Sequence, residues 1–443
     1  MIESKFAPNK DLLKIRPMEI DVKHLTEDAK RQIQDDVQST PQIYYYGVQI
    51  DMEAIRTLSI SSNGILPEMT IVFNDQSGLI RSDNFPTDDA VISVFLPSGS
   101  KLVKNIRMDF KILAYGETNE SGESLTIMKC LASIPQMYIK QFKSYPSMNS
   151  WNVMKKIATD TGLGFNTNID STKDSMTWLN PGQTPFWMIQ DVTKHAWSGE
   201  SGFLWSFVDF YYNLNYVDVE RCLQDTTILE APVSALNAAT GDAADVLSPM
   251  VLSNDLSYQT SRNYFNKYVV NNKSTQLSLE NGYLRKLAYY DKYGNWDEKA
   301  GSLQIFAIDS ITTPGSEAST VILKGNPSDM EFFKQNVSYE WYGKIDTKNV
   351  HPDFAYAVVQ NSQNLNDLQK VSVSITLPAA NFAVIRFQKL NLFFTERLTS
   401  QPNTRLSGQW LVTGITYTYT KRRSFSQTIT LVKRELNVDD RTK

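Results

Sequence analysis

Strict alternation of apolar and polar residues is the feature that most constrains how this 443-residue chain can fold. It is most regular over residues 406–436, "LSGQWLVTGITYTYTKRRSFSQTITLVKREL". Successive side chains of a β-strand point to opposite faces of its sheet, so the two alternating sets belong to two faces. The apolar set contains Ile415, Tyr417, Tyr419, Phe425, Ile429 and Leu431, and the hydroxyl set contains Thr416, Thr418, Thr420, Ser426, Thr428 and Thr430. The basic turn "TKRRS" separates two alternating segments, which together predict a β-hairpin with one apolar face and one hydroxyl face.

The same period of two recurs earlier in the chain. Turn residues separate five alternating segments, at residues 40–52, 67–75, 88–100, 104–117 and 123–133. Short strands at this spacing are typical of a small antiparallel β-barrel or sandwich. A second such unit is expected at the end of the chain, where a helical pattern over residues 351–370 precedes "VSVSITLP", "FAVIRFQKLNLFF" and the hairpin.

Between these units the apolar period becomes that of a helix. One helix is predicted to begin at Asn149 or Ser150 and to end at Gly162, a residue type that favours the left-handed conformation after a last turn. A second helix is predicted to begin at Thr184, with Pro185 in its first turn. The segment "GFLWSFVDFYYNLNYVDVE" then predicts two strands that fold back near residues 212–213.

These patterns predict a mainly β, α+β chain: two small antiparallel β-barrel domains with an α+β insert domain between them. The expected segments are an N-terminal arm with a short helix (1–38), the first β-barrel (39–145), the α+β insert (146–230), a linker or exposed loop (231–254), a further β-rich region (255–345) and the second β-barrel with one helix (346–443).

The sequence offers no catalytic, nucleotide-binding or metal-binding motif. His24, His195 and His351 lack a second histidine or cysteine at metal-ligand spacing, so no metal or cofactor is expected. Cys130 and Cys222 are expected to be buried thiols rather than a disulfide. The candidate carboxylates Asp209 and Asp218 are assigned to strand turns and exposed faces, and the chain is predicted not to be an enzyme.

Charge and hydropathy narrow the function classes further. The 44 basic and 48 acidic residues give a net charge of −4, which argues against a protein that grips DNA through its phosphates. The N-terminus "MIESKFAPNKDLLKIRPMEIDVKH" mixes acids with bases and lacks an apolar run, so no signal peptide is expected. The longest apolar patch, "GFLWSFVDFYYNLNYV", is broken by polar residues, so membrane insertion is not expected either. Aromatic residues are dense in the insert and are expected to fill its core. In the alternative interpretation, Trp187 and Trp205 form a platform for sugars.

Two segments carry a resemblance to a known family. The first comprises "SWNVMKKIATDTGLGF" (150–165) and "WLNPGQTPFWMIQDVTKHAWSGESGFLWSFVDFYYNLNYVD" (178–218). The second begins at "FAYAVVQNSQ" (354–363) and ends with the hairpin. They resemble the helix–loop–helix–hairpin insert and the last barrel of the baseplate hub proteins of contractile phage tails. That family includes the T-even phage hub, the late-control D proteins and the N-terminal half of VgrG spikes.

The resemblance implies a mechanical role in the virion tail. Three copies would form a ring with six quasi-equivalent barrels, joining a central spike to the tail tube or tube-initiator protein. The ring would enclose the channel through which tape-measure protein and DNA pass. Thr416, Thr418, Thr428 and Thr430 would face this lumen or the neighbouring subunit. No spike segment is present, so the spike is expected to be another polypeptide.

Other consequences of the resemblance are less direct. The N-terminal arm and residues 270–330 are longer than a minimal hub needs, which suggests contacts with wedge or tape-measure proteins. Assembly is expected in the host cytoplasm. Two alternatives stay open: a carbohydrate-binding or host-binding tail protein, and the hub of a secretion or phage-derived injection system.

Overall fold

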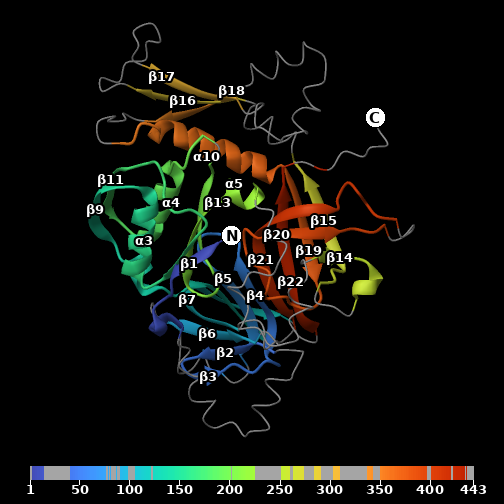
Figure 1. The fold of residues 1–443 in the computed structure, drawn as a ribbon. Coiled ribbons are helices and arrows are strands. Elements are labelled where there is room, and N and C mark those ends of the chain that lie inside the picture. The colour runs from blue at the N-terminus through green and yellow to red at the C-terminus, as the bar shows by residue number, and fades with distance from the viewer. Residues whose placement is uncertain are drawn as a thin grey trace.

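Figure 1 shows the computed structural model of the chain, in which strands predominate. The structure describes residues 2–13, 40–75, 78, 80, 86, 90–97, 105–120, 123–200, 202–224, 251–259, 263–273, 284–290, 303–309, 337–342, 350–396, 401–420, 423–434 and 436. The predicted helix within 1–38, most of the predicted linker 231–254 and the tip of the basic turn lie outside these residues.

The α+β insert is built around a four-stranded sheet with the order β1-β10-β13-β12. Its strands are β1 (Glu3–Phe6), β10 (Gly164–Thr167), β12 (Leu204–Val208) and β13 (Asn213–Asp218). The first strand comes from the predicted N-terminal arm, and Phe6 stacks on Phe165 with ring centroids 5.9 Å apart. The arm therefore completes the insert by adding an antiparallel strand to β10.

Both predicted helices of the insert are confirmed. In α3 (Ser150–Thr161), the Asn149 side chain accepts from the Asn152 N–H, and Gly162 ends the helix with a φ of 77°. In α4 (Pro185–His195), the Thr184 side chain accepts from the Trp187 N–H. The insert also contains the ribbon of β9 (Gln141–Met148) and β11 (Met176–Gln183), and α5 (Val219–Gln224) continues directly from β13.

A 13-stranded sheet forms the rest of the core. From the first predicted β unit it takes β2 (Gln42–Tyr45), β3 (Val48–Gln49), β4 (Ile55–Ser62), β5 (Glu68–Asn74), β6 (Val91–Leu96), β7 (Ile106–Glu120) and β8 (Glu123–Ala132). From the remainder of the chain it takes β14 (Val251–Ser253), β15 (Lys267–Asn272), β19 (Val371–Leu377), β20 (Lys389–Phe393), β21 (Gly408–Thr420) and β22 (Arg423–Lys433). The predicted hairpin is confirmed as β21 and β22.

The prediction of two separate closed barrels differs from this structure. The described strands of both units belong to one sheet, and none of them closes it into a barrel. The link is β21, which pairs with β22 along one edge. On its other edge, residues 408–411 pair with β20 and residues 415–420 pair with β4. Because β20 covers only the first residues of this long strand, β4 satisfies the backbone groups that remain. We call the pairing of β21 with β4 the seam.

Helix α10 (Phe354–Gln369), predicted from the sequence, lies across the insert and the end of the large sheet (Figure 1). Beyond it lies a small sheet of β16 (Leu284–Tyr290), β17 (Leu303–Asp309) and β18 (Val337–Tyr342), in the order β17-β16-β18. In the described part of the chain, no helix is long and apolar enough to cross a membrane.

Candidate functional site: a hydroxyl face and a polar junction

The hydroxyl side of the hairpin continues across five neighbouring strands. Residues directly opposite one another on paired strands share a face. One cross-strand row contains Thr376, Thr428, Thr416 and Ser61, on β19, β22, β21 and β4. The next contains Ser426, Thr418, Ser59 and Thr70, on β22, β21, β4 and β5. A third pairs Ser374 with Thr430. We call these ten residues the hydroxyl face.

All ten hydroxyl side chains are half-exposed. At the usual strand spacing of about 4.8 Å, five strands give this face a width of roughly 20 Å. Charged residues enter its rows only at the two ends, where Lys267 of β15 opposes Thr376, and Glu68 and Lys129 follow on β5 and β8. The face is therefore a broad, uncharged surface that can exchange hydrogen bonds with water.

The four threonines singled out from the sequence lie side by side here. Thr416 opposes Thr428, Thr430 lies one row away, and Thr418 opposes Ser426. Their side chains make few contacts: the Thr376 and Thr428 hydroxyls are 3.4 Å apart, and Asn63 Nδ2 donates to Thr416 Oγ1 at 3.4 Å. Sequence periodicity found the hairpin and β19 parts of the face. It did not reveal that β4 and β5 extend the face into the other unit.

Gly414 marks the start of the seam. A Cβ at this position would lie 2.3 Å from Asn63 Oδ1, because the turn between β4 and β5 crosses directly over it. The hairpin register also shifts between Val412 and Gly414. A larger residue where β21 passes from its partner β20 to its partner β4 would therefore require the exposed Asn63 side chain to move aside.

On the other face of the seam, large apolar side chains form the core. The predicted core residues Ile415, Tyr417, Ile429 and Leu431 are buried, and Tyr419 is half-buried. Tyr417 packs between Phe382 at 4.8 Å, Phe210 at 5.6 Å and Phe425 at 5.7 Å between ring centroids. The apolar prediction is confirmed, and Phe210 shows that the insert shares this core.

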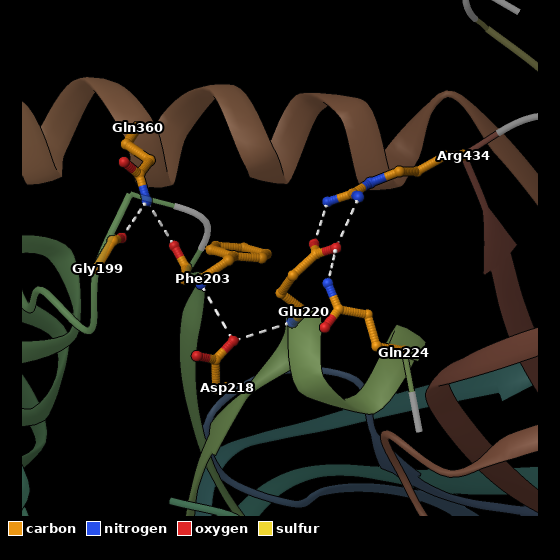
Figure 2. A network of polar contacts seen from close by, with 8 residues as sticks. Gly199, Phe203, Asp218, Glu220, Gln224, Gln360 and Arg434 are labelled. Carbon is orange, nitrogen blue, oxygen red and sulfur yellow. Dashed lines mark hydrogen bonds and ion pairs between the residues drawn. The ribbon is translucent and has the colours of Figure 1, made fainter. Parts of the chain in front are cut away.

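A polar network joins α10, the insert and the end of β22 (Figure 2), and we call it the junction. Gln360 Nε2 of α10 donates to the carbonyls of Gly199 and Gly202, at 3.0 and 2.7 Å. Arg434 makes two hydrogen bonds to the Glu220 carboxylate, with a shortest distance of 2.6 Å from Nη2 to Oε2. Both partners are largely buried, so the ion pair links β22 firmly to α5.

Asp218 contacts the backbone of two residues at the junction, Phe203 and Glu220, as Figure 2 shows. Its Oδ1 accepts from the Phe203 N–H at 3.2 Å and the Glu220 N–H at 3.0 Å. Burial raises the pKa of its carboxyl, and these hydrogen bonds offset only part of that rise. The assignment of Asp218 to an exposed face was wrong. The residue is buried, and its carboxylate also accepts from the Ser198 hydroxyl.

Asp209 is a turn residue, as predicted, but it is not on an open surface. Its carboxylate accepts from the Tyr211 and Asn213 N–H groups and from the Asn213 and Asn215 side-chain amides. Burial raises the pKa of this carboxyl as well. The four donors hold the Asp209 carboxylate in the turn between β12 and β13, so the role of this residue is structural.

The side chain of His351 contacts the backbone of His195, although 156 residues separate the two histidines. His351 Nε2 lies 2.9 Å from the His195 carbonyl oxygen, and the His195 ring stacks on Phe354 at 4.2 Å. Burial lowers the pKa of His351. The pair fixes the start of α10 to the end of α4. His24 lies outside the described residues, and no cluster of three or more metal-ligating side chains occurs within them.

The insert aromatics divide between core and cavity. Trp197, Tyr212 and Tyr216 are buried, which agrees with a core role. Trp205 is half-buried and lines a cavity of about 250 Å³ with Phe203, Val358 and Leu365. The indole of Trp205 therefore lies among apolar side chains of this wall, beside polar residues such as Gln190 and Asn361.

Arg386 connects the three units. It is 4% exposed, and its Nε donates to the Thr413 carbonyl at 2.8 Å. Nη1 donates to the Gly64 carbonyl at 2.6 Å, and Nη2 donates to the Asn63 carbonyl at 3.2 Å. The guanidinium also lies 4.4 Å from the Phe207 ring centroid. Burial lowers its pKa to about 9, which leaves it charged at neutral pH.

Comparison with known proteins supports this architecture. No family model and no curated protein matches the sequence. Among solved structures, the 43 kDa tail protein of prophage MuSo2 from Shewanella oneidensis matches with a TM-score of 0.54 and 7% identity, over 90% of this chain and 100% of that one. The tail protein from Neisseria meningitidis MC58 matches with a TM-score of 0.50 and 8% identity, over 89% of this chain and 96% of that one.

The chain has the fold of phage tail proteins. This finding agrees with the resemblance that the insert and hairpin segments indicate. A component of the type VI secretion system from E. coli is also similar, at 10% identity and a TM-score of 0.43 over 90% of this chain and 79% of that one.

Proposed function

We propose that the chain is a structural, non-enzymatic hub of a contractile phage tail baseplate. Three copies form a pseudo-six-fold ring that joins the central spike to the tail tube or tube-initiator protein. The fold shared with phage tail proteins supports a place in the tail. The observation that carries the hub assignment is the hydroxyl face, because it runs without a charged residue from one β unit into the other across the seam.

The hydroxyl face suits the wall of a channel for DNA and tape-measure protein. Lysine or arginine on such a wall would bind phosphates and retard the DNA. Acidic residues would repel it. Half-exposed threonine and serine hydroxyls do neither, and they keep the wall hydrated. DNA is thus a passenger in transit, and Thr416, Thr418, Thr428 and Thr430 line its path.

Edge strand β15 offers the surface for ring closure. It pairs with β19 on one side and has no partner strand on the other among the described strands. Val269 and Tyr268 on this strand are 58% and 44% exposed. Exposed apolar residues on an open edge favour pairing with another chain. We assign this edge to the contact between neighbouring subunits of the ring.

The oligomeric state tests this assignment. Mass measurement of the purified chain with its spike and tube partners should give three copies per complex. Val269→Lys should leave a folded monomer that does not trimerise. Thr177→Lys, on the exposed side of β11, is the matched control and should assemble normally. A chain that stays monomeric with both partners present contradicts the proposal.

DNA transit tests the channel wall. In assembled particles, Thr418→Lys together with Thr428→Lys should slow DNA ejection, most strongly at low salt, while Thr177→Lys leaves it unchanged. Normal ejection from normally assembled double-variant particles would show that the hydroxyl face lines no DNA channel.

Two other functions need separate discrimination. The hub of a secretion or phage-derived injection system would share the ring and the spike contact but would pass protein rather than DNA. Particles that carry this chain and contain no genome would decide for it. Host-glycan binding through Trp187 and Trp205 is the other alternative, and a glycan-binding assay on the Trp205→Phe variant tests it.

A further inference from the structure

A cavity of about 390 Å³ lies where the N-terminal segment, the insert and the C-terminal unit meet. Its walls include Ile2 and Pro8, the aromatic rings of Phe207 and Phe210, and Ile415 on the buried side of β21. Ligand pockets in proteins usually measure about 300–1,000 Å³ and combine apolar walls with a few polar groups. This cavity has both properties.

Arg386 supplies the cavity with a buried positive charge. All its protein partners are uncharged oxygens: the carbonyls of Asn63, Gly64 and Thr413 and the Ser62 hydroxyl. No carboxylate of the described residues forms an ion pair with it. Buried charges are normally paired. Asp209 lines the same cavity but forms no ion pair with the guanidinium, so Arg386 points to an anion that the chain itself does not provide.

Two further polar atoms of the cavity wall have unused capacity. Asn166 Oδ1 is buried and has no hydrogen-bond partner among the described residues. The Tyr417 hydroxyl likewise has none in this part of the chain, although its ring is firmly packed. Asp209 also lines the cavity, but four donors already occupy its carboxylate. The free set is therefore two donors, Arg386 and Tyr417, and one acceptor, Asn166.

We propose that this cavity binds the carboxylate end of a short apolar ligand. The carboxylate accepts from the Arg386 guanidinium and the Tyr417 hydroxyl, which are suited to a charge-assisted contact. An N–H of the ligand donates to Asn166 Oδ1, and its apolar body fills the space between Phe207 and Phe210. The C-terminus of a partner polypeptide and a free carboxylic acid both have a carboxylate and an apolar body. Only the peptide also supplies the N–H.

The N-terminal segment gives this site a removable wall. Ile2, Ser4, Ala7 and Pro8 line the cavity, and β1 is an edge strand of its sheet. Asn9 N–H donates to the Gly162 carbonyl at 2.7 Å, which fixes the segment at its far end. A ligand that displaced residues 2–8 from the rim would break their pairing with β10 and would leave the large sheet intact. The site is independent of the ring and of the channel wall.

Calorimetry on the full chain tests the proposal with three probes: N-acetyl-leucyl-leucine, its C-terminal amide, and hexanoate. We expect the peptide acid to bind at least tenfold more tightly than the amide. Hexanoate weaker than the peptide acid identifies a polypeptide terminus as the source, and equal binding identifies a free carboxylic acid. Equal affinity for acid and amide, or no binding of either acid, overturns the proposal.

Variants locate the binding without relying on Arg386, whose removal can unfold the chain. Tyr417→Phe keeps the packed ring and should weaken binding of the peptide acid several-fold while the melting temperature stays the same. Ser4→Trp places an indole at the rim and should abolish binding, whereas Thr177→Trp, far from the cavity on exposed β11, should not. Full affinity in both Tyr417→Phe and Ser4→Trp would show that the ligand binds elsewhere and would overturn the proposal.

Discussion

The seam and the junction attach two different parts of the chain to the C-terminal unit, and they do so by different means: the seam attaches the first β unit and the junction attaches the insert. At the seam, β21 and β4 pair through a backbone ladder from Ile415–Ser62 to Thr420–Thr57, and the side chains follow simple alternation. At the junction, particular side chains such as Gln360, Glu220 and Arg434 make the contacts. The contacts of the seam are therefore made by backbone groups, which every residue type except proline provides in full. The junction depends on individual donors and acceptors.

The largest effect is expected on the buried side of the seam. Tyr417→Ala removes a ring that packs against Phe210, Phe382 and Phe425, and should lower the free energy of unfolding by ~3–5 kcal/mol. Urea denaturation measures this loss. Tyr417→Phe is the control and should be nearly neutral. A small effect of the alanine variant would mean that the insert and the sheet do not share a core.

At the junction, Gln360→Leu should cost ~1–2 kcal/mol, because the half-buried Gly199 and Gly202 carbonyls lose their donor. The exposed Gln369→Leu at the end of α10 is the matched control and should change stability little. Equal effects of the two leucine variants in thermal unfolding would show that the junction contributes through apolar packing alone.

The start of the seam is tested by Gly414→Ala. The new Cβ meets Asn63 Oδ1, the end of an exposed side chain that can rotate away, so we expect a loss of no more than ~1 kcal/mol. Combining it with Asn63→Ala should recover most of that loss, since the obstructing amide is removed. Additive losses in this double-mutant cycle would place the strain elsewhere.

Asp218→Asn should stabilise the protein at neutral pH by ~1 kcal/mol, the ordinary scale of single substitutions. Burial raises the pKa of the Asp218 carboxyl in the folded state, so its ionisation lowers stability as the pH rises through that pKa. Asparagine retains an oxygen for the Phe203 and Glu220 N–H groups and does not ionise. The advantage of the variant should therefore shrink as the pH falls toward 4, as unfolding curves at several pH values can measure. An advantage independent of pH contradicts this account.

The smallest effect is expected on the outer side of the seam. Thr418→Val keeps the shape of the side chain and removes a half-exposed hydroxyl, so the free energy of unfolding should change by less than about 0.5 kcal/mol. Compared with Tyr417→Ala one residue earlier, it measures the difference between the two faces of one strand. A large loss would show that the hydroxyl face stabilises the single chain.

Much of the local structure follows from the sequence. The caps at Asn149, Gly162 and Thr184, the helix of residues 354–369 and the two faces of the hairpin each depend on residues close together in the chain. The burial of Asp218 could not be predicted, because a buried carboxylate leaves no local periodic signal in the sequence. The His195–His351 contact could not be predicted either, because 156 residues separate the two partners.

The sequence by itself determined which face of each strand is apolar and which carries hydroxyls. The alternation depends only on the pleat of the strand. Only the tertiary structure shows that β21 pairs along residues 415–420 with β4, rather than with another strand of the C-terminal unit. Backbone hydrogen bonds are the same for every residue type, so sequence cannot name the partner of an edge. That choice merges two expected barrels into one sheet and extends the hydroxyl face across both units.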